Sequence, residues 1–261
     1  MEVLIQNSPQ EGSLLAAKVI AQLVRQKPDC TLGLATGRTP TRLYAELIRM
    51  HREESLDFSQ VKTFNLDEYL GLPPSSPHSY HHFMQAELFD HINIQAQNTH
   101  LPNGLSDDPR QECKRYEAKI RDAGGIDLQV LGLGSNGHIG FNEPTGSLAS
   151  RTWIKILSEN TIKDNSALFE NPADVPRHCI TMGIGTILEA RHCLVLAFGQ
   201  SKSKAIHAMI EGPVTALWPA SALQQHQRTT VILDQESSTR LNFTDHYQWI
   251  ARNKLDWQQY G

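Results

Sequence analysis

The segment Val130–Pro144 holds the residues best suited to acid–base chemistry. Its sequence, VLGLGSNGHIGFNEP, contains His138 and Glu143. An imidazole titrates near neutral pH and a carboxylate can orient it, so this pair suits general acid–base catalysis. A second candidate is Asp67, which with Glu68 follows the apolar run in TFNLDEYLGLP. Neighbouring side chains of an extended segment point to opposite faces, so we expect at most one of these carboxylates to face a ligand. Burial would raise its pKa toward neutrality, as abstraction of a proton beside a carbonyl requires.

The glycines of the same segment also fit a dinucleotide-binding turn. Gly132, Gly134 and Gly137 have the spacing G-x-G-x-x-G. An acid about 20 residues further on, Glu159, adds support for a ribose contact. The third glycine should, however, open a long helix, and the residues that follow, HIGFNEPTG, include a proline and glycines that disfavour one. The sequence therefore favours acid–base chemistry over NAD binding, with glycines that bring the backbone close to a ligand.

Two strand ends are suited to bind an anion such as phosphate. LATGRTP leads from a strand into a helix, whose free backbone N–H groups would be joined there by the hydroxyls of Thr36 and Thr39 and by Arg38. The alternative for this segment is a plain turn with a threonine cap. In FGQSKSKA, Lys202 lies at a helix start, where the dipole disfavours a cation unless an anion binds between them. Together these residues predict a small phosphorylated substrate and proton transfer, with no metal or redox cofactor.

The candidates follow short apolar runs that alternate with helical patterns. The runs predict strands in VLI, CTLGLAT, VKTFNL, IDLQVLGLG, WIKILS, HCLVLAFG and TTVILD. Apolar spacing predicts a helix over 14–24, and the segments PTRLYAELIRMHREE and SYHHFMQAELFDHI also favour helices. This alternation predicts an α/β fold: a mostly parallel sheet with helices on both faces and ligands at the carboxyl ends of its strands.

Composition is that of an ordinary globular protein. The 261 residues are 39% hydrophobic and 20% charged with a formal charge of −4, so nucleic acid is not indicated as a partner. No window approaches the roughly 18 apolar residues of a membrane helix, and MEVLIQNSPQEG does not resemble a signal peptide. Four widely spaced cysteines give no zinc pattern and suit free thiols in a reducing cytoplasm. We expect one cytoplasmic domain over 1–261, in which 237–261 is a polar tail that serves as an interface or a lid, or is partly disordered.

The motifs LATGRTP, TFNLDEYLGLP, LGLGSNGHIGFNEP, SLASRT and FGQSKSKA resemble, in this order, those of glucosamine-6-phosphate deaminases. The resemblance runs through most of the chain. It implies a Rossmann-like fold shared with 6-phosphogluconolactonases and ribose-5-phosphate isomerases. It also implies conversion of glucosamine 6-phosphate and water into fructose 6-phosphate and ammonium without a cofactor. It leaves open whether the chain forms a homo-oligomer.

The resemblance assigns a role to each candidate residue. It makes Asp67 the carrier of a proton from C2 to C1 and His138 the ring-opening base. Glu143 would hold that histidine, and Asn136 stands where many members have an aspartate that assists ring opening. The phosphate-binding positions of the family correspond here to Thr36, Gly37 and Lys202.

Three departures from the family pattern qualify these expectations. Ala167 stands where the family usually has an arginine that reaches the substrate phosphate, and Arg38 stands where a small residue is usual. We therefore expect Arg38 to replace the missing arginine; the alternatives are a solvent-facing Arg38 or use of Lys163. The activator site of the allosteric members is altered too, so we expect no activation by N-acetylglucosamine 6-phosphate: Lys155 is retained, but the other positions hold Gly146, Trp153 and Ile156.

Other functions stay open beside this one. A galactosamine-6-phosphate deaminase/isomerase would differ in the C4 epimer it accepts, which the sequence does not determine. A 6-phosphogluconolactonase hydrolyses an ester and needs no carrier for a C2 proton, so Asp67 argues against it. A sugar-phosphate-sensing regulator descended from an enzyme would not need Asp67, His138 and Glu143 together.

Overall fold

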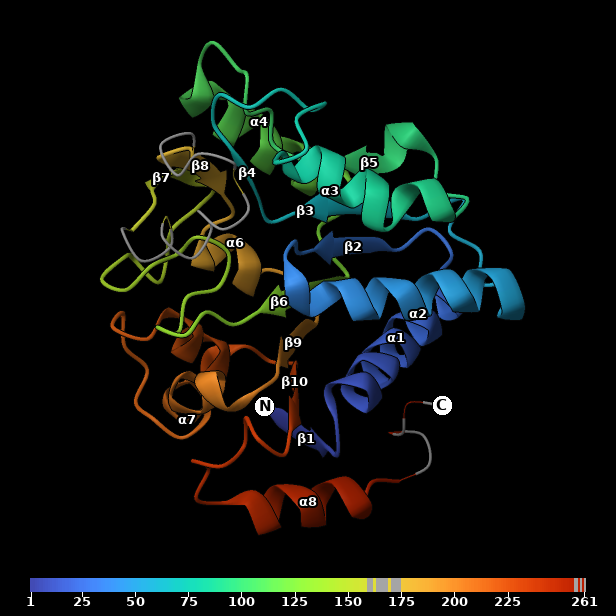
Figure 1. Cartoon of the computed structure of the whole chain (residues 1–261), viewed down its shortest axis with the longest axis vertical. Coiled ribbons are helices and arrows are strands. Elements are labelled where there is room, and N and C mark those ends of the chain that lie inside the picture. The colour runs from blue at the N-terminus through green and yellow to red at the C-terminus, as the bar shows by residue number, and fades with distance from the viewer. Residues whose placement is uncertain (159–161, 163–168, 170–174, 256–257, 259, 261) are drawn as a thin grey trace.

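The centre of the fold is a parallel sheet of seven strands, in the order β1-β10-β9-β6-β2-β3-β5 (Figure 1). The computed structural model describes residues 1–158, 162, 169, 175–255, 258 and 260. Within this part every strand pair of the sheet is parallel. The strands are β1 (Glu2–Gln6), β2 (Thr31–Leu34), β3 (Lys62–Asn65), β5 (Thr99–His100), β6 (Leu128–Gly132), β9 (Cys193–Ala197) and β10 (Thr229–Asp234).

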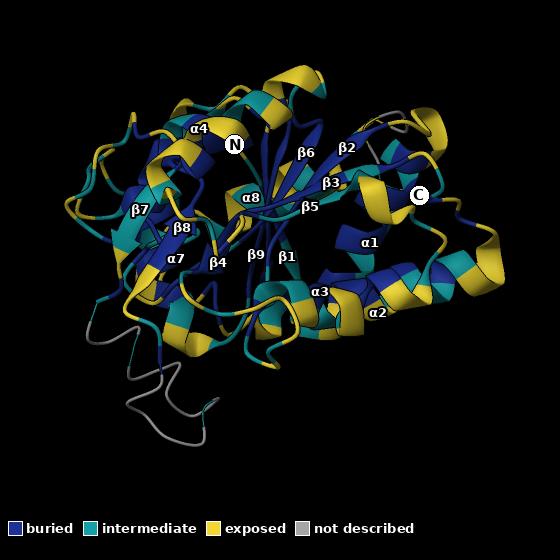
Figure 2. Cartoon of the chain, turned by 90° about the horizontal axis from the view of Figure 1, so that it is seen from above, coloured by how far each residue is buried: buried dark blue, intermediate teal, exposed yellow. Residues whose placement is uncertain are grey.

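Helices cover both faces of this sheet, as the sequence predicts. One face carries α1 (Pro9–Gln26), α2 (Arg38–Glu54) and α3 (Tyr80–Glu87); the other carries α4 (Pro109–Asp122), α6 (Ile184–Leu188) and α7 (Ser203–Ile210). Alternate side chains of a strand serve the two layers: Leu194 and Leu196 pack with the first set, whereas Val195 and Ala197 pack with the second. The buried strands accordingly lie between helices whose outer faces are exposed (Figure 2).

The helix starts are encoded locally. The Ser8 side chain accepts a hydrogen bond from the backbone N–H of Glu11 before α1, and Asp108 accepts from Arg110 and Gln111 before α4. Such caps satisfy N–H groups that have no partner within the helix. The helix α2 is different, because its cap residue is Gly37 and no side chain caps it. The first turn of α2 therefore keeps backbone donors for another partner.

A second, antiparallel sheet lies beside the large one and corrects one expectation. It has the order β4-β8-β7, formed by β4 (Asp67–Tyr69), β8 (His178–Thr181) and β7 (Trp153–Ile156). The run WIKILS does form a strand, but its expected place in the parallel sheet is wrong. β7 pairs with one strand only, so it is an edge strand of the small sheet. Ile156 is 70% exposed, whereas strands of a parallel sheet are covered by helices on both faces.

The C-terminal segment forms a helix, α8 (Thr244–Arg252), that packs beside β1 at the end of the sheet (Figure 1). Beyond it, the Lys254 ammonium lies 2.5 Å from a carboxylate oxygen of Glu2, and the Tyr260 hydroxyl donates to Glu2 at 2.9 Å. These contacts tie the described part of the expected tail to the first strand. No helix of the described ranges has the length and apolar character needed to cross a membrane.

Candidate active site

A cleft of about 530 Å³ opens where the carboxyl ends of β9, β6, β2 and β3 meet. Its lining includes seven of the nine predicted site residues, which come from four separate loops: Thr36, Gly37, Arg38, Thr39, Asp67, His138 and Lys202. The chain passes from β2 outward to β3 and β5 and then returns to β6 on the other side of β2. Such a reversal opens a crevice at the carboxyl end of an α/β sheet, where ligands bind. The structure thus brings these seven residues together at one edge of the sheet, whereas Asn136 and Glu143 do not line the cleft.

Asp67 is the buried carboxyl of this cleft. Its exposure is 6%, and no hydrogen bond from the described residues lowers its pKa. Burial, with the adjacent Glu68 carboxylate as a second cause, raises the pKa of Asp67 to about 8. A carboxyl of this kind holds its proton near neutral pH and exchanges it readily, which suits general acid–base catalysis. Glu68 points away from the cleft, as the alternation of an extended segment predicts.

The loop after β6 holds His138 by its backbone. The Gly134 N–H donates to the carbonyl of His138 at 2.9 Å, and the Gly137 N–H donates to the carbonyl of Gly134 at 3.0 Å. Gly137 has a φ of +81°, a conformation that favours glycine. Residues 133–152 contain no helix, so the structure does not form the helix that the dinucleotide alternative requires. The glycines serve a tight loop that presents an imidazole.

Asn136 and Glu143 lie behind His138 rather than on the cleft wall. Asn136 Nδ2 donates to Glu143 Oε2 at 2.5 Å, and Asn136 Oδ1 accepts from the backbone N–H of His138 at 3.2 Å. The same Glu143 oxygen is 3.6 Å from His138 Nδ1, and Ser158 donates to the other oxygen at 3.2 Å. In the described residues His138 Nδ1 has no hydrogen-bond partner. The three side chains are thus neighbours, with a gap between histidine and carboxylate that a small movement would close into a hydrogen bond.

The other end of the cleft is suited to an anion. Gly37, with a φ of +99°, turns the chain into α2, and Arg38 and Thr39 begin that helix without a side-chain cap. Lys202 is the cap residue of α7 on the facing strand end. Backbone donors, hydroxyls and two cations around one space form an arrangement suited to an anion such as phosphate. Arg38 lines the cleft, whereas Ala167 and Lys163 fall outside the described residues.

Several lining residues were not predicted from the sequence. Tyr80, the first residue of α3, and Phe141 add an aromatic wall, with ring planes 7° apart and centroids 6.3 Å apart. The Tyr80 hydroxyl donates to the Tyr69 hydroxyl at 3.3 Å and also contacts Thr36. Burial raises the pKa of Tyr80 well above its usual value, so the hydroxyl stays a donor. The serine that caps α3, Ser79, is a local signal for a helix start. No local pattern shows that this start lies against β4, so Tyr80 could not be assigned to the cleft.

Two of the three altered activator positions, Trp153 and Ile156, lie in β7 of the small sheet, and Gly146 lies in the loop before it. The Lys155 ammonium sits 4.5 Å from the centre of the Trp153 ring, a cation–π contact. Ile156 is exposed. The retained lysine is therefore engaged with a residue that itself departs from the family pattern.

Comparison with known proteins agrees with this geometry. The family model for glucosamine-6-phosphate isomerases/6-phosphogluconolactonase matches residues 9–232. A glucosamine-6-phosphate deaminase of Hahella chejuensis is 51% identical, over 98% of this chain and 97% of its own length. One of Rhodococcus jostii is 46% identical over the whole of both chains.

Solved structures share the fold. A monomeric glucosamine-6-phosphate deaminase superposes with a TM-score of 0.90 at 43% identity, and covers 92% of this chain and all of its own. A 6-phosphogluconolactonase from Trypanosoma cruzi has a TM-score of 0.75 at 21% identity, over 92% of this chain and 97% of its own, which shows a shared fold alone. The chain belongs to the glucosamine-6-phosphate isomerase/6-phosphogluconolactonase family.

Proposed function

We propose that this chain is a glucosamine-6-phosphate deaminase, which converts glucosamine 6-phosphate and water into fructose 6-phosphate and ammonium. The observation that carries the proposal is Asp67, a buried carboxyl whose pKa is raised to about 8, in one cleft with His138 and an anion-binding helix start. Relatives that are 46% and 51% identical over nearly their full length carry this name.

In the proposed first step His138 opens the sugar ring. Its imidazole takes the proton of the O1 hydroxyl, the C1–O5 bond breaks, and the imidazolium passes that proton to O5. Glu143 closes onto His138 Nδ1 and stabilises the imidazolium that forms, while Asn136 holds Glu143 in place. Since Asn136 is neutral, it orients these groups without adding the charge of an aspartate.

In the second step Asp67 moves one proton between adjacent carbons. The amino group enters this step as ammonium. Asp67 removes the proton at C2 of the open aldehyde while the ammonium gives a proton to O1, which yields an enolamine, and Asp67 then returns its proton to C1. The nitrogen at C2 is then an iminium. Water adds to this carbon, and the C–N bond breaks to leave the ketone of fructose 6-phosphate and ammonium. No electrons enter or leave, so the reaction needs no redox cofactor.

The phosphate would bind at the start of α2, where backbone donors lack a cap. Thr36, Gly37 and Thr39 form this loop, and Lys202 lines the same cleft from the loop after β9, on the other side of β6. Arg38 would supply the guanidinium contact that the family takes from the position of Ala167. A phosphate held in this way fixes the sugar with C1 and C2 between Asp67 and His138.

We further propose a cytoplasmic location, from the cysteines, and a single domain, from the packing of the C-terminal segment. Cys30, Cys113, Cys179 and Cys193 are all buried and free, which suits the reducing cytoplasm. We treat 1–261 as a single domain, because the described tail packs on the first strand and adds no residue to the cleft.

A side-by-side assay tests this function. Ammonium release should be measured with glucosamine 6-phosphate and galactosamine 6-phosphate, together with hydrolysis of 6-phosphogluconolactone, for the wild type and Asp67→Asn. The proposal expects ammonium and fructose 6-phosphate from the first substrate and loss of both in the variant. Faster release from the galactosamine compound would assign the enzyme to the other epimer. Lactone hydrolysis without ammonium release would overturn the proposal.

A further inference from the structure

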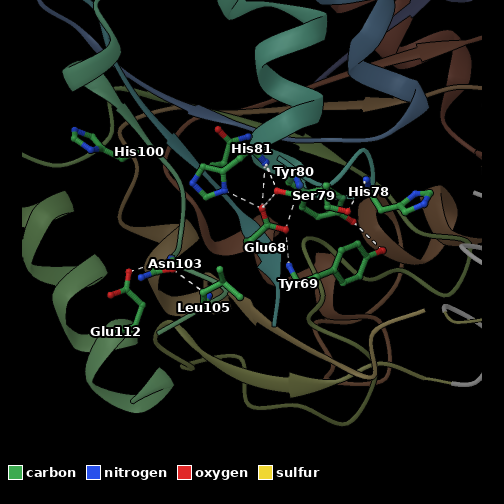
Figure 3. A network of polar contacts seen from close by, with 12 residues as sticks. Glu68, Tyr69, His78, Ser79, Tyr80, His81, His100, Asn103, Leu105 and Glu112 are labelled. Carbon is green, nitrogen blue, oxygen red and sulfur yellow. Dashed lines mark hydrogen bonds and ion pairs between the residues drawn. The ribbon is translucent and has the colours of Figure 1, made fainter. Parts of the chain in front are cut away.

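The two neighbouring carboxylates of β4 face different partners. Asp67 lines the cleft, whereas Glu68 is 1% exposed and points toward the start of α3 (Figure 3). The catalytic scheme above uses Asp67 only. A buried charge that the scheme does not use is costly unless it is fully hydrogen-bonded, so its surroundings indicate its purpose.

Five donor groups surround the two oxygens of Glu68. The backbone N–H groups of Tyr69 and Tyr80 donate to Oε1 at 2.7 and 3.1 Å. The Ser79 hydroxyl and the backbone N–H of His81 donate to Oε2 at 2.7 and 3.1 Å, and His81 Nδ1 lies 2.9 Å from the same oxygen. A carboxylate that only accepts fits this set of donors, and a helix start favours its negative charge. Glu68 thereby joins β4 to the first turn of α3.

This joint positions one wall of the cleft. Tyr80 is the first residue of α3, and its own N–H is one of the donors to Glu68. Its ring lines the cleft beside Asp67, and its hydroxyl reaches Tyr69 and Thr36. If the start of α3 moved away from β4, the ring would leave the space between the proton carrier and the phosphate loop.

The joint also fixes a negative charge behind Asp67. The Glu68 carboxylate contributes to the raised pKa of Asp67. The other titratable groups that face the pair come from β4, α3, α4 and β8: Tyr69, Tyr80, His81, Tyr116 and Cys179. Burial raises the pKa of the three tyrosines and the cysteine, so these groups are neutral at physiological pH. Among these neighbours, Glu68 supplies the negative charge that Asp67 experiences.

We propose that Glu68 is a positioning residue of this active site, which clamps the start of α3 so that Tyr80 forms the cleft wall, and which places a fixed negative charge behind Asp67. The proposal deepens the deaminase function proposed above and rests on it.

The test compares Glu68→Gln with a matched control, Glu112→Gln. Glu112 is a carboxylate of 5% exposure in the first turn of α4 that accepts from Asn103 N and Arg115 Nε, each at 3.1 Å, and it does not line the cleft (Figure 3). Glu68→Gln should lower kcat/KM for glucosamine 6-phosphate by about tenfold or more, because it disturbs the cleft wall. It should also move the acid limb of the kcat/KM profile to lower pH by about half a unit or more. The control should leave both within the error of the wild type.

Two further variants separate the negative charge of Glu68 from the hydrogen bonds by which it holds the start of α3. Glu68→Asp keeps the charge, so the acid limb should stay near its wild-type position even where kcat/KM falls. Ser79→Ala removes one donor to the clamp without changing charge, so it should raise KM with the limb in place. A merely structural role would lower stability in all three variants and leave the limb unmoved in each.

A second readout does not depend on turnover. Carbon-13 NMR titration of the Asp67 carboxyl should show a lower pKa in Glu68→Gln than in the wild type and no change in Glu112→Gln. If wild-type protein releases ammonium but neither the limb nor the titration moves in Glu68→Gln, the proposal is wrong. If the titration moves while wild-type protein releases no ammonium, the positioning role stands and the deaminase function fails. If Glu68→Gln does not fold, Glu68→Asp provides the test. This variant keeps the negative charge, so a shift of its acid limb or of the pKa of Asp67 would overturn the proposal.

Discussion

The imidazole of His138 lies against the α-carbon of Gly134: a Cβ on that glycine would come within 2.3 Å of ring Cε1. Gly134→Ala should therefore push the ring out of its place without straining the backbone, whose φ at this residue is not positive. We expect it to reproduce the defect of His138→Gln, a loss of turnover that is larger for the pyranose than for an open-chain analogue. Comparing both substrates in both variants checks this. Equal losses on the two substrates would contradict the ring-opening role.

Asp67→Asn should abolish movement of the C2 proton. The amide keeps the shape of the side chain but cannot act as a base, and loss of a general base costs about 10²–10⁴ in rate. Exchange of the substrate C2 hydrogen with deuterated solvent, followed by NMR, should disappear together with ammonium release. Exchange that persists at the wild-type rate would assign the base to another residue.

The same substitution should stabilise the fold at neutral and alkaline pH. The folded pKa of Asp67 is raised to about 8, whereas that of an unfolded aspartate is about 3.9. Between these values the folded state keeps a proton that the unfolded state has lost, so wild-type stability falls as pH rises from about 4 to about 8. The amide that replaces the carboxyl does not titrate, so the Tm difference in favour of Asp67→Asn should grow over this range and then level off. Thermal melts at several pH values measure it; a difference independent of pH would contradict the burial argument.

Arg38 should carry much of the phosphate affinity. Removal of a charge-assisted contact costs about 1.5–3 kcal/mol, which is about 10- to 150-fold in binding. Arg38→Ala should thus raise KM for glucosamine 6-phosphate strongly, and Ala167→Arg added to it should recover part of the loss. Steady-state kinetics of the single and double variants test this. A single variant within about twofold of wild type in KM and kcat would show that Arg38 faces solvent.

N-acetylglucosamine 6-phosphate should not activate the enzyme. An activator acts through unequal affinity for two states, and the expected phosphate contacts are replaced by Gly146, Trp153 and the exposed Ile156. Lys155 is occupied by its contact with the Trp153 ring. We expect hyperbolic kinetics that this compound leaves unchanged. Sigmoidal kinetics that it renders hyperbolic would reverse this conclusion.

Much of the large sheet could be predicted because its strands are buried on both faces. Val3–Ile5 and the residues 231–233 of TTVILD are continuous apolar stretches, and both runs form strands of the sheet as predicted. The opposite orientations of Asp67 and Glu68 followed from the period of an extended chain alone. The pairing of the small sheet could not be predicted from the sequence. β4 has three residues and β8 has four, and tertiary contacts decide with which strand such a short segment pairs.

The polar contacts of the site could be predicted only in part. The shared location of Asp67, His138 and Lys202 could be predicted, because each follows a strand and parallel strands place the loops after them at one edge of the sheet. The role of Tyr80 depends on where α3 begins against β4, which is decided by hydrogen bonds to Glu68 across 12 residues of chain. A sequence pattern does not record contacts of that kind.

The order β6-β2-β3 has a consequence for how such a site changes over evolution or by design. β2, whose end carries the loop 36–39, stands between β6, whose end carries the loop of His138, and β3, which leads to Asp67. In the proposed mechanism, ring opening and proton transfer therefore depend on separate loops, and the loop that would bind the phosphate lies between them. Residues around His138 or around Asp67 can be substituted while the loop 36–39 and the other catalytic segment are kept. We therefore expect that a change of reaction on this fold needs substitutions in one catalytic loop at a time, with the loop 36–39 unchanged.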